Sequence, residues 1–211
     1  MSVQRAFPLM SLMPLVFALA ACAHEPAPSD SSPSDRSAKE NAPMTTTATA
    51  AEAFAPKLDA EQSLRRLLDL IRGSRSIQDI NAERLREVFG VSFAEASGRH
   101  GFAERLDRDW WSSFELDPNS AYGPRFEFAF RPDPPNANPA ATSICALDYK
   151  AFAAELEAMG FRHETYRAEH NRIIHEQFER PGMTVQVYTR GEAEAPPEKT
   201  AHACVHMVLV N

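Results

Sequence analysis

The spacing of apolar and polar residues predicts three helices. Asp59 and Gln62 have the spacing of a helix capping box, and leucines at helical spacing follow them until Gly73. A shorter helical pattern covers 82–89, and a third runs from 148 to 160, with an aspartate at its start and a glycine at its end. A glycine-rich stretch after the second helix is expected to be a loop.

Period-two alternation dominates the rest of the chain. Phe126, Phe128 and Phe130 alternate with polar residues, which is typical of a half-buried strand, and the proline-rich stretch 131–140 is expected to be a loop. Four more strand patterns follow closely on one another, at 161–167, 172–179, 183–189 and 202–210. In the last of these we expect the core face to carry Ala203, Val205, Met207 and Leu209. The fold class is therefore α+β: a mostly antiparallel sheet with about three helices packed on one face.

Composition divides the chain into three parts. Residues 1–21 have one early positive charge, Arg5, and then an apolar run broken by two prolines, which is too short to span a membrane and is typical of a signal peptide. Of the 35 residues 23–57, 23 are Ala, Pro, Ser or Thr, so we expect 22–57 to be a disordered tether. Residues 58–211 are expected to form one globular domain.

The stretch Leu19-Ala20-Ala21-Cys22 resembles the lipobox of bacterial lipoproteins. This resemblance implies that the leader is removed and that Cys22 is acylated, for example with palmitate. Two or more acyl chains anchor a protein stably to a membrane. Ala23, rather than Asp, implies sorting to the outer membrane on its periplasmic side. The alternative is an ordinary signal peptide that is cut after an Ala-x-Ala sequence.

Charge and motifs limit the classes of function. Residues 58–211 carry 18 Lys+Arg and 24 Asp+Glu, a net charge of −6, with no basic run, so nucleic acid and anionic lipid surfaces are poor candidate partners. Ser112-Ser113 lacks the G-x-S-x-G context, and the chain has no H-E-x-x-H, P-loop or G-x-G-x-x-G motif. We therefore expect no enzyme and no cofactor. His163, His170 and His175 lack metal-ligand spacing and are expected at the surface or in turns.

The two remaining cysteines have two possible roles. In the oxidising compartment that the lipobox resemblance implies, Cys145 and Cys204 are expected to form a disulfide. The alternative is a zinc site, because His202, Cys204 and His206 alternate along one predicted strand and would share a face.

The stretch DRDWWSSFEL, residues 107–116, is the candidate for a partner-binding site. If it is a strand, its two tryptophans face opposite sides, so one is expected in the core and the other under local cover or a partner. Its paired aspartates are expected to be solvated rather than a catalytic pair. The candidate residues are Trp110, Trp111, Asp107, Asp109 and Glu115, together with the loop 131–140.

At the level of class, the chain is similar to bacterial immunity lipoproteins, which neutralise antibacterial effectors in the periplasm. The likeness rests on the lipobox, the tether, the small disulfide-closed domain and the stretches 76–91 and 147–161. It implies an envelope-anchored inhibitor that occludes a toxin, and it transfers no binding residue. The alternatives are a structural or assembly lipoprotein of an envelope complex and a metal-dependent hydrolase that uses His202, Cys204 and His206.

Overall fold

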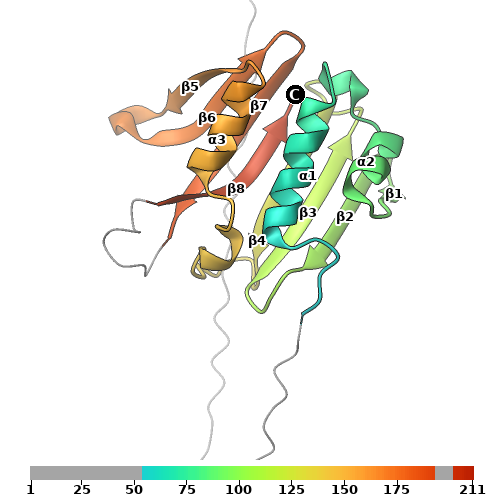
Figure 1. Cartoon of the computed structure of the whole chain (residues 1–211). Coiled ribbons are helices and arrows are strands. Elements are labelled where there is room, and N and C mark those ends of the chain that lie inside the picture. Colours follow the sequence, from blue (N-terminus) through green and yellow to red (C-terminus); the bar gives the residue numbers. More distant parts are fainter. Residues whose placement is uncertain (1–53, 193–201) are drawn as a thin grey trace, which may run out of the picture. The chain divides into compact units, whose positions relative to one another are not determined.

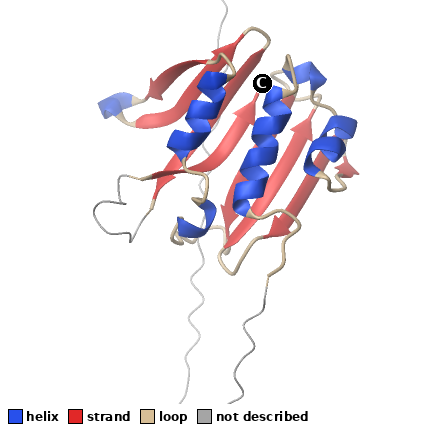
Figure 2. Ribbon diagram, in the orientation of Figure 1, coloured by secondary structure: helices blue, strands red, loops and turns tan. Residues whose placement is uncertain are grey.

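The computed structural model describes residues 54–192 and 202–211, which form one eight-stranded antiparallel sheet with helices on one face (Figures 1 and 2). The predicted α+β class is confirmed. The helices are α1 (Ala60–Arg72), α2 (Ala82–Phe89) and α3 (Tyr149–Ala158), with 3-10 turns η1 (Ile77–Asp79), η2 (Thr142–Ile144) and η3 (Glu169–Asn171). The strands are β1 (Ala94–Ala96), β2 (Arg99–Arg105), β3 (Trp110–Asp117), β4 (Arg125–Pro132), β5 (Arg162–Arg167), β6 (Ile173–Arg180), β7 (Met183–Gly191) and β8 (Ala203–Val210).

The sheet consists of two meanders that meet at their last strands. Its order is β1-β2-β3-β4-β8-β7-β6-β5, and β4 pairs antiparallel with β8 at the centre. A helix precedes each meander. Helices α1 and α3 lie side by side over the sheet (Figure 1), and an ion pair of 2.9 Å between Arg72 and Glu155 joins them. This repeated arrangement was not predictable, because the two halves share no visible residue pattern.

The helices begin where their capping residues predict. Asp59 accepts a hydrogen bond from the backbone N–H of Gln62, whose side chain accepts one in return, so the predicted capping box is confirmed. Asp148 caps α3 in the same way through the N–H of Ala151. Before α1, the N–H groups of Lys57 and Leu58 donate to Glu104. No helix in the described residues is long and apolar enough to cross a bilayer.

Aromatic residues fill the space between the sheet and the helices. Phe126, Phe128 and Phe130 of β4 are fully buried, as predicted, and Phe89 of α2 packs edge-on against Phe114 of β3 with 4.6 Å between ring centroids. Because the three β4 rings point toward the helices, the residues between them lie on the opposite side of the sheet.

The predicted core face of the last strand is wrong in its second half. Val208 and Val210 are fully buried and pair with Phe128 and Phe126, so they face the helices. Met207 and Leu209 therefore lie half-buried on the opposite side. Both faces of β8 are apolar here, and alternation cannot distinguish two apolar faces. The sheet consequently carries apolar side chains at the centre of the side without helices.

Candidate functional site on the open face of the sheet

The side of the sheet opposite α1 and α3, here called the open face, is not covered by any helix in the described residues (Figure 2). Strand β3 shows the division, because Trp110, Ser112, Phe114 and Leu116 are buried toward the helices. The alternate side chains of β3 project from the open face: Trp111, Ser113, Glu115 and Asp117. Two of the candidate residues, Trp111 and Glu115, are therefore on one accessible surface.

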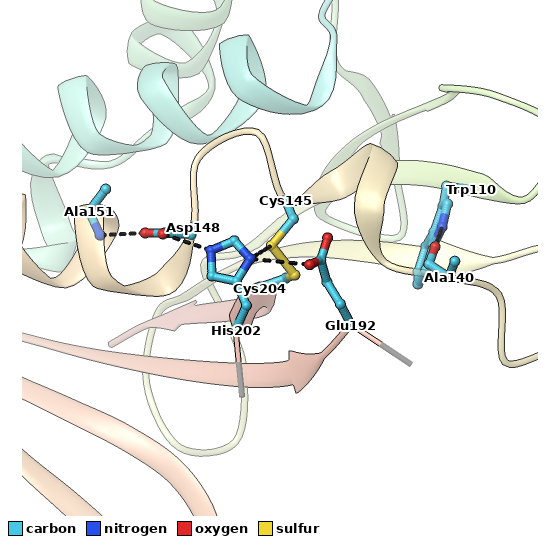
Figure 3. Close-up of a disulfide and its surroundings, with 8 residues drawn as sticks. All are labelled: Trp110, Ala140, Cys145, Asp148, Ala151, Glu192, His202 and Cys204. Carbon is cyan, nitrogen blue, oxygen red and sulfur yellow. Dashed lines mark hydrogen bonds and ion pairs between the residues drawn. A yellow bond between two sulfur atoms is a disulfide. The ribbon is translucent and has the colours of Figure 1, made fainter. Parts of the chain in front are cut away.

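The two tryptophans face opposite sides, as their adjacent positions predict. Trp110 is 1% exposed and donates its indole N–H to the carbonyl of Ala140, 3.1 Å away (Figure 3). It is a core residue, so its place among the candidate contacts is wrong. Trp111 is 36% exposed and donates its indole N–H to the carboxylate of Asp133 at 3.2 Å.

A charged residue holds Trp111 in place from the neighbouring strand. Arg105 of β2 forms an ion pair of 3.0 Å with Asp133, and its guanidinium lies 5.9 Å from the centroid of the Trp111 ring. The indole is therefore fixed by a hydrogen bond and a cation–π contact while much of its surface remains accessible. An exposed aromatic side chain fixed in this way loses little conformational entropy when it binds a partner.

Polar side chains surround Trp111 along β3 and β4. Ser113 accepts a hydrogen bond from Arg131 at 2.9 Å, and Arg131 also pairs with Glu127 at 2.6 Å. Glu115 pairs with Arg99 of β2 at 3.3 Å. These pairs are substantially exposed, so each contributes little to stability. They orient charges of both signs around the tryptophan.

The candidate aspartates of the β2–β3 turn do not share one role. The Asp107 carboxylate accepts hydrogen bonds from the backbone N–H groups of Asp109 and Trp110, at 2.7 and 2.8 Å. Asp107 thus stabilises the turn, whereas the Asp109 side chain is exposed. Of the aspartate pair, only Asp109 therefore remains free for an outside contact.

Side chains that lie opposite one another on neighbouring strands form a row across the open face. Apart from one histidine, these side chains carry no formal charge. The row begins beside Trp111 and ends on edge strand β5. It consists of Ala103, Ser113, Ala129, Met207, Tyr188, His175 and Tyr166, and is called the central row below. It gives the open face an apolar middle that single-strand patterns did not predict.

The β5 end of the central row is aromatic. Tyr166 and His175 stack with 4.9 Å between ring centroids, and Tyr188 lies 5.3 Å from His175 on the other side. His175 is only 7% exposed, which contradicts its predicted place at the surface or in a turn. Its buried Nδ1 atom has no hydrogen-bond partner among the described residues. Tyr166, in contrast, is 54% exposed.

The disulfide joins the end of η2 to the start of β8 (Figure 3). Cys145 and Cys204 are bonded, which confirms the predicted pair. His202 is in contact with this bridge, since its Nδ1 atom lies 3.7 Å from the sulfur of Cys145. The bridge and its surroundings fasten the last strand to the segment before α3.

Two carboxylates hold the ring of His202. Nε2 lies 2.8 Å from Asp148, and Nδ1 lies 3.3 Å from Glu192, which is 4% exposed. The hydrogen bond to Asp148, followed by the one to Glu192, raises the pKa of His202 above its ordinary value. The pKa of Asp148 is lowered, first by the Ala151 N–H and then by His202. The ring of His202 is therefore partly exposed, and a carboxylate holds each of its two nitrogen atoms.

The disulfide also bears on the zinc alternative. Donor atoms of Cys145, Cys204, His202 and Glu192 lie within 4.8 Å of one another. A cysteine binds zinc as a thiolate, however, and here the two sulfurs are bonded to each other. His206, the third ligand of the predicted set, instead lies against Trp110, with 6.3 Å between ring centroids.

A second polar cluster joins α3 to the β5–β6 hairpin, and sequence reasoning missed it. His163 lies 2.9 Å from the carboxylate of Glu176 and 3.2 Å from the hydroxyl of Tyr149. Burial, followed by Glu176 and then Glu157, raises the pKa of Tyr149 above its ordinary value. These groups are far apart along the chain and follow no motif. The cluster fixes the base of the hairpin, and His163 is exposed there, as expected for a surface residue.

Comparison of the chain with family models, with curated proteins and with solved structures finds no match. Function is therefore inferred from the geometry of the described residues and from the sequence features at the start of the chain.

Proposed function

We propose that this protein is an envelope-anchored binding protein of the periplasm that blocks an antibacterial effector toxin by covering its active site. Cys22, which lies outside the described residues, is proposed as the lipid anchor and the following segment as the tether. The folded domain is proposed to act by occlusion, without catalysis or a cofactor, and its open face is proposed as the contact surface.

The observation that supports this proposal best is the state of Trp111. Tryptophan is among the residues most enriched at the energetic centres of protein interfaces. Trp111 is accessible, yet Asp133 and Arg105 already hold its ring in place. The core does not need its exposed surface, because Trp110 fills the equivalent position on the helix side. A rigid aromatic group, on a face that no helix covers in the described part of the chain, suits the binding of a protein partner.

A growth competition tests the proposed function. A strain that lacks the gene is grown with its parent, either in contact or separated by a filter, and a secretion-deficient parent serves as the control. Killing of the mutant only by the contact-competent parent, with rescue by the wild-type gene, is the expected result. Equal survival in all cultures contradicts the proposal and favours the assembly lipoprotein.

Trp111 is tested in the same strains. Loss of a residue at the energetic centre of an interface costs about 2 kcal/mol or more, which corresponds to roughly a 30-fold weaker Kd. Trp111→Ala is therefore expected to lose protection while it accumulates to the wild-type level. Tyr122→Ala is the matched control, because Tyr122 is 99% exposed in the β3–β4 connection. Full protection by Trp111→Ala would remove this residue from the proposed contact surface.

A further inference from the structure

The β5–β6 hairpin has the features of an inserting element, and this inference rests on the proposed function. We propose that the end of this hairpin, residues 166–174, enters a carboxylate-lined cleft of the partner enzyme while the rest of the open face packs around the mouth of that cleft. This assigns the blocking contact to a segment at the opposite end of the central row from Trp111.

The hairpin end concentrates exposed apolar surface. Five large apolar or aromatic side chains are exposed in the described part of the chain, and three of them are here: Tyr166 at 54%, Ile173 at 45% and Ile174 at 40%. Figure 1 shows why they lack cover, since the end of the hairpin with η3 reaches past α3. Such a group of exposed apolar residues on a soluble domain is typical of an interaction site.

The apolar side chains point to both faces of the hairpin. Tyr166 stacks on His175, so both belong to the open face. Arg167, the next residue along β5, faces the other side, and it pairs with Ile173 after a shift in register, so Ile173 projects on the helix side. Glu176 faces α3 through its contact with His163, so Ile174 projects on the helix side as well. A flat partner on the open face would bury Tyr166 and leave both isoleucines in water, whereas a cleft that encloses the hairpin end buries all three side chains.

The charge at this end differs from that of the whole chain. The chain has a formal net charge of −7, whereas residues 166–174 contain two arginines, Arg167 and Arg172, and one glutamate, Glu169. Arg167 donates to the carbonyl of Asn171 at 3.1 Å, so its guanidinium is held at the turn. Arg172 is exposed beside it. A locally basic, apolar tip is complementary to a cleft that carries carboxylates.

The backbone at the tip is constrained. His170 and Asn171 both have left-handed φ angles, 60° and 61°, which are uncommon for residues other than glycine. A hydrogen bond of 2.8 Å from Ala168 N–H to the Arg172 carbonyl closes the turn. The tip therefore has a defined shape before binding, as an inserting element requires.

The distance across the sheet allows one partner to contact both ends of the open face. Strands β3 and β5 are five strand spacings apart, which is about 24 Å at about 4.8 Å per spacing. A standard interface covers about 800 Å² on each partner, equivalent to a square about 28 Å on a side. Trp111 and the hairpin therefore fit within one interface.

The competition described above tests the hairpin through variants of the complementing gene. Arg172→Glu places like charges together, and the double change Ile173→Ser and Ile174→Ser removes the apolar contacts. Each is expected to lower survival of the complemented strain at least tenfold, since like-charge contacts cost several kcal/mol. Arg66→Glu, on α1 at the opposite side of the sheet, and Tyr122→Ala are the matched exposed controls and should protect fully. Immunoblots and thermal unfolding of the purified variants verify that each one folds.

The outcomes separate this inference from the proposed function. If the deletion strain is not killed in contact, the proposed function and the hairpin inference both fail. If Trp111→Ala loses protection but the folded hairpin variants protect like the wild type, only the hairpin inference fails. A sedimentation experiment can also overturn the hairpin inference. It uses the chain from residue 22 with Cys22→Ser. The inference fails if this chain sediments with phosphatidylethanolamine–phosphatidylglycerol vesicles while the same chain with Ile173→Ser and Ile174→Ser does not. That result would make the tip a membrane contact.

Discussion

Removal of the disulfide should cost this domain a large part of its stability. Cys145 and Cys204 are 59 residues apart in sequence. A cross-link that closes a loop of about 60 residues lowers the entropy of the unfolded chain and thereby raises its free energy by about 4 kcal/mol at 25 °C. A domain of this size has a total stability of about 5–15 kcal/mol. The double variant Cys145→Ala/Cys204→Ala is therefore expected to be folded but markedly less stable.

Contacts beside the bridge should not replace it. His202 still pairs with Asp148 at 2.8 Å, and the backbone bridge between Asp148 and Cys204 needs no sulfur. These contacts exist only in the folded state, whereas the disulfide acts mainly by restricting the unfolded state. Alanine is the suitable replacement because position 204 is fully buried, and a serine hydroxyl there would add a desolvation cost.

Urea unfolding followed by tryptophan fluorescence measures this effect. We expect a loss of about 4 kcal/mol, and a fall in Tm of about 8–16 °C at about 2–4 °C per kcal/mol. Dithiothreitol should destabilise the wild type by the same amount and leave the double variant unchanged. A loss below about 1 kcal/mol would refute the reasoning, because it would mean that the unfolded chain is already constrained without the bridge.

Two further predictions concern neighbouring and titrating residues. Trp110→Ala should destabilise the domain by about 3–5 kcal/mol, since it empties a core site, while Trp111→Ala should change stability by less than about 1 kcal/mol; similar losses in urea unfolding would contradict the assignment of the two faces. The raised pKa of His202 adds stability that is fully present below its unfolded value near 6.5 and disappears as pH rises through the folded pKa. The stability difference between wild type and His202→Gln should therefore shrink between pH 6 and pH 8. A difference that does not change with pH would show that the carboxylates of Asp148 and Glu192 do not raise the pKa of His202.

The sequence was sufficient where a signal is local. The capping box at Asp59 and the alternating phenylalanines of β4 depend on residues within a few positions of one another, and both are confirmed. The stretch that forms strands β1 and β2 was expected to be a loop, and that expectation is wrong. Gly101 and Ala103 are small residues, so the stretch lacks the alternation of apolar and polar side chains that marks a strand. These two small residues project little from the open face next to Trp111.

The candidate site was only partly predictable for a different reason. Opposite orientations of Trp110 and Trp111 follow from their adjacency, but which one is buried depends on the side that the helices cover. The central row depends on register across seven strands, and the contact between His163 and Glu176 depends on the pairing of β5 with β6. Neither is encoded within one window of sequence. The expected surface position of His175 failed because its cover comes from Tyr166 and Tyr188 on neighbouring strands.

The paired meanders explain how this domain can combine a stable core with an exposed hairpin. The central strands β4 and β8 are covered by α1 and α3, and the disulfide fastens β8 to the segment before α3, so stability is concentrated at the middle of the sheet. Edge strand β5 lies three strands away from β8, and its hairpin end extends beyond helical cover (Figure 1). The contact of His163 with Glu176 fixes the base of that hairpin and leaves its tip accessible. Substitutions at Arg172 or Ile173 therefore change solvent-exposed groups, and we expect them to leave the centre of the sheet folded.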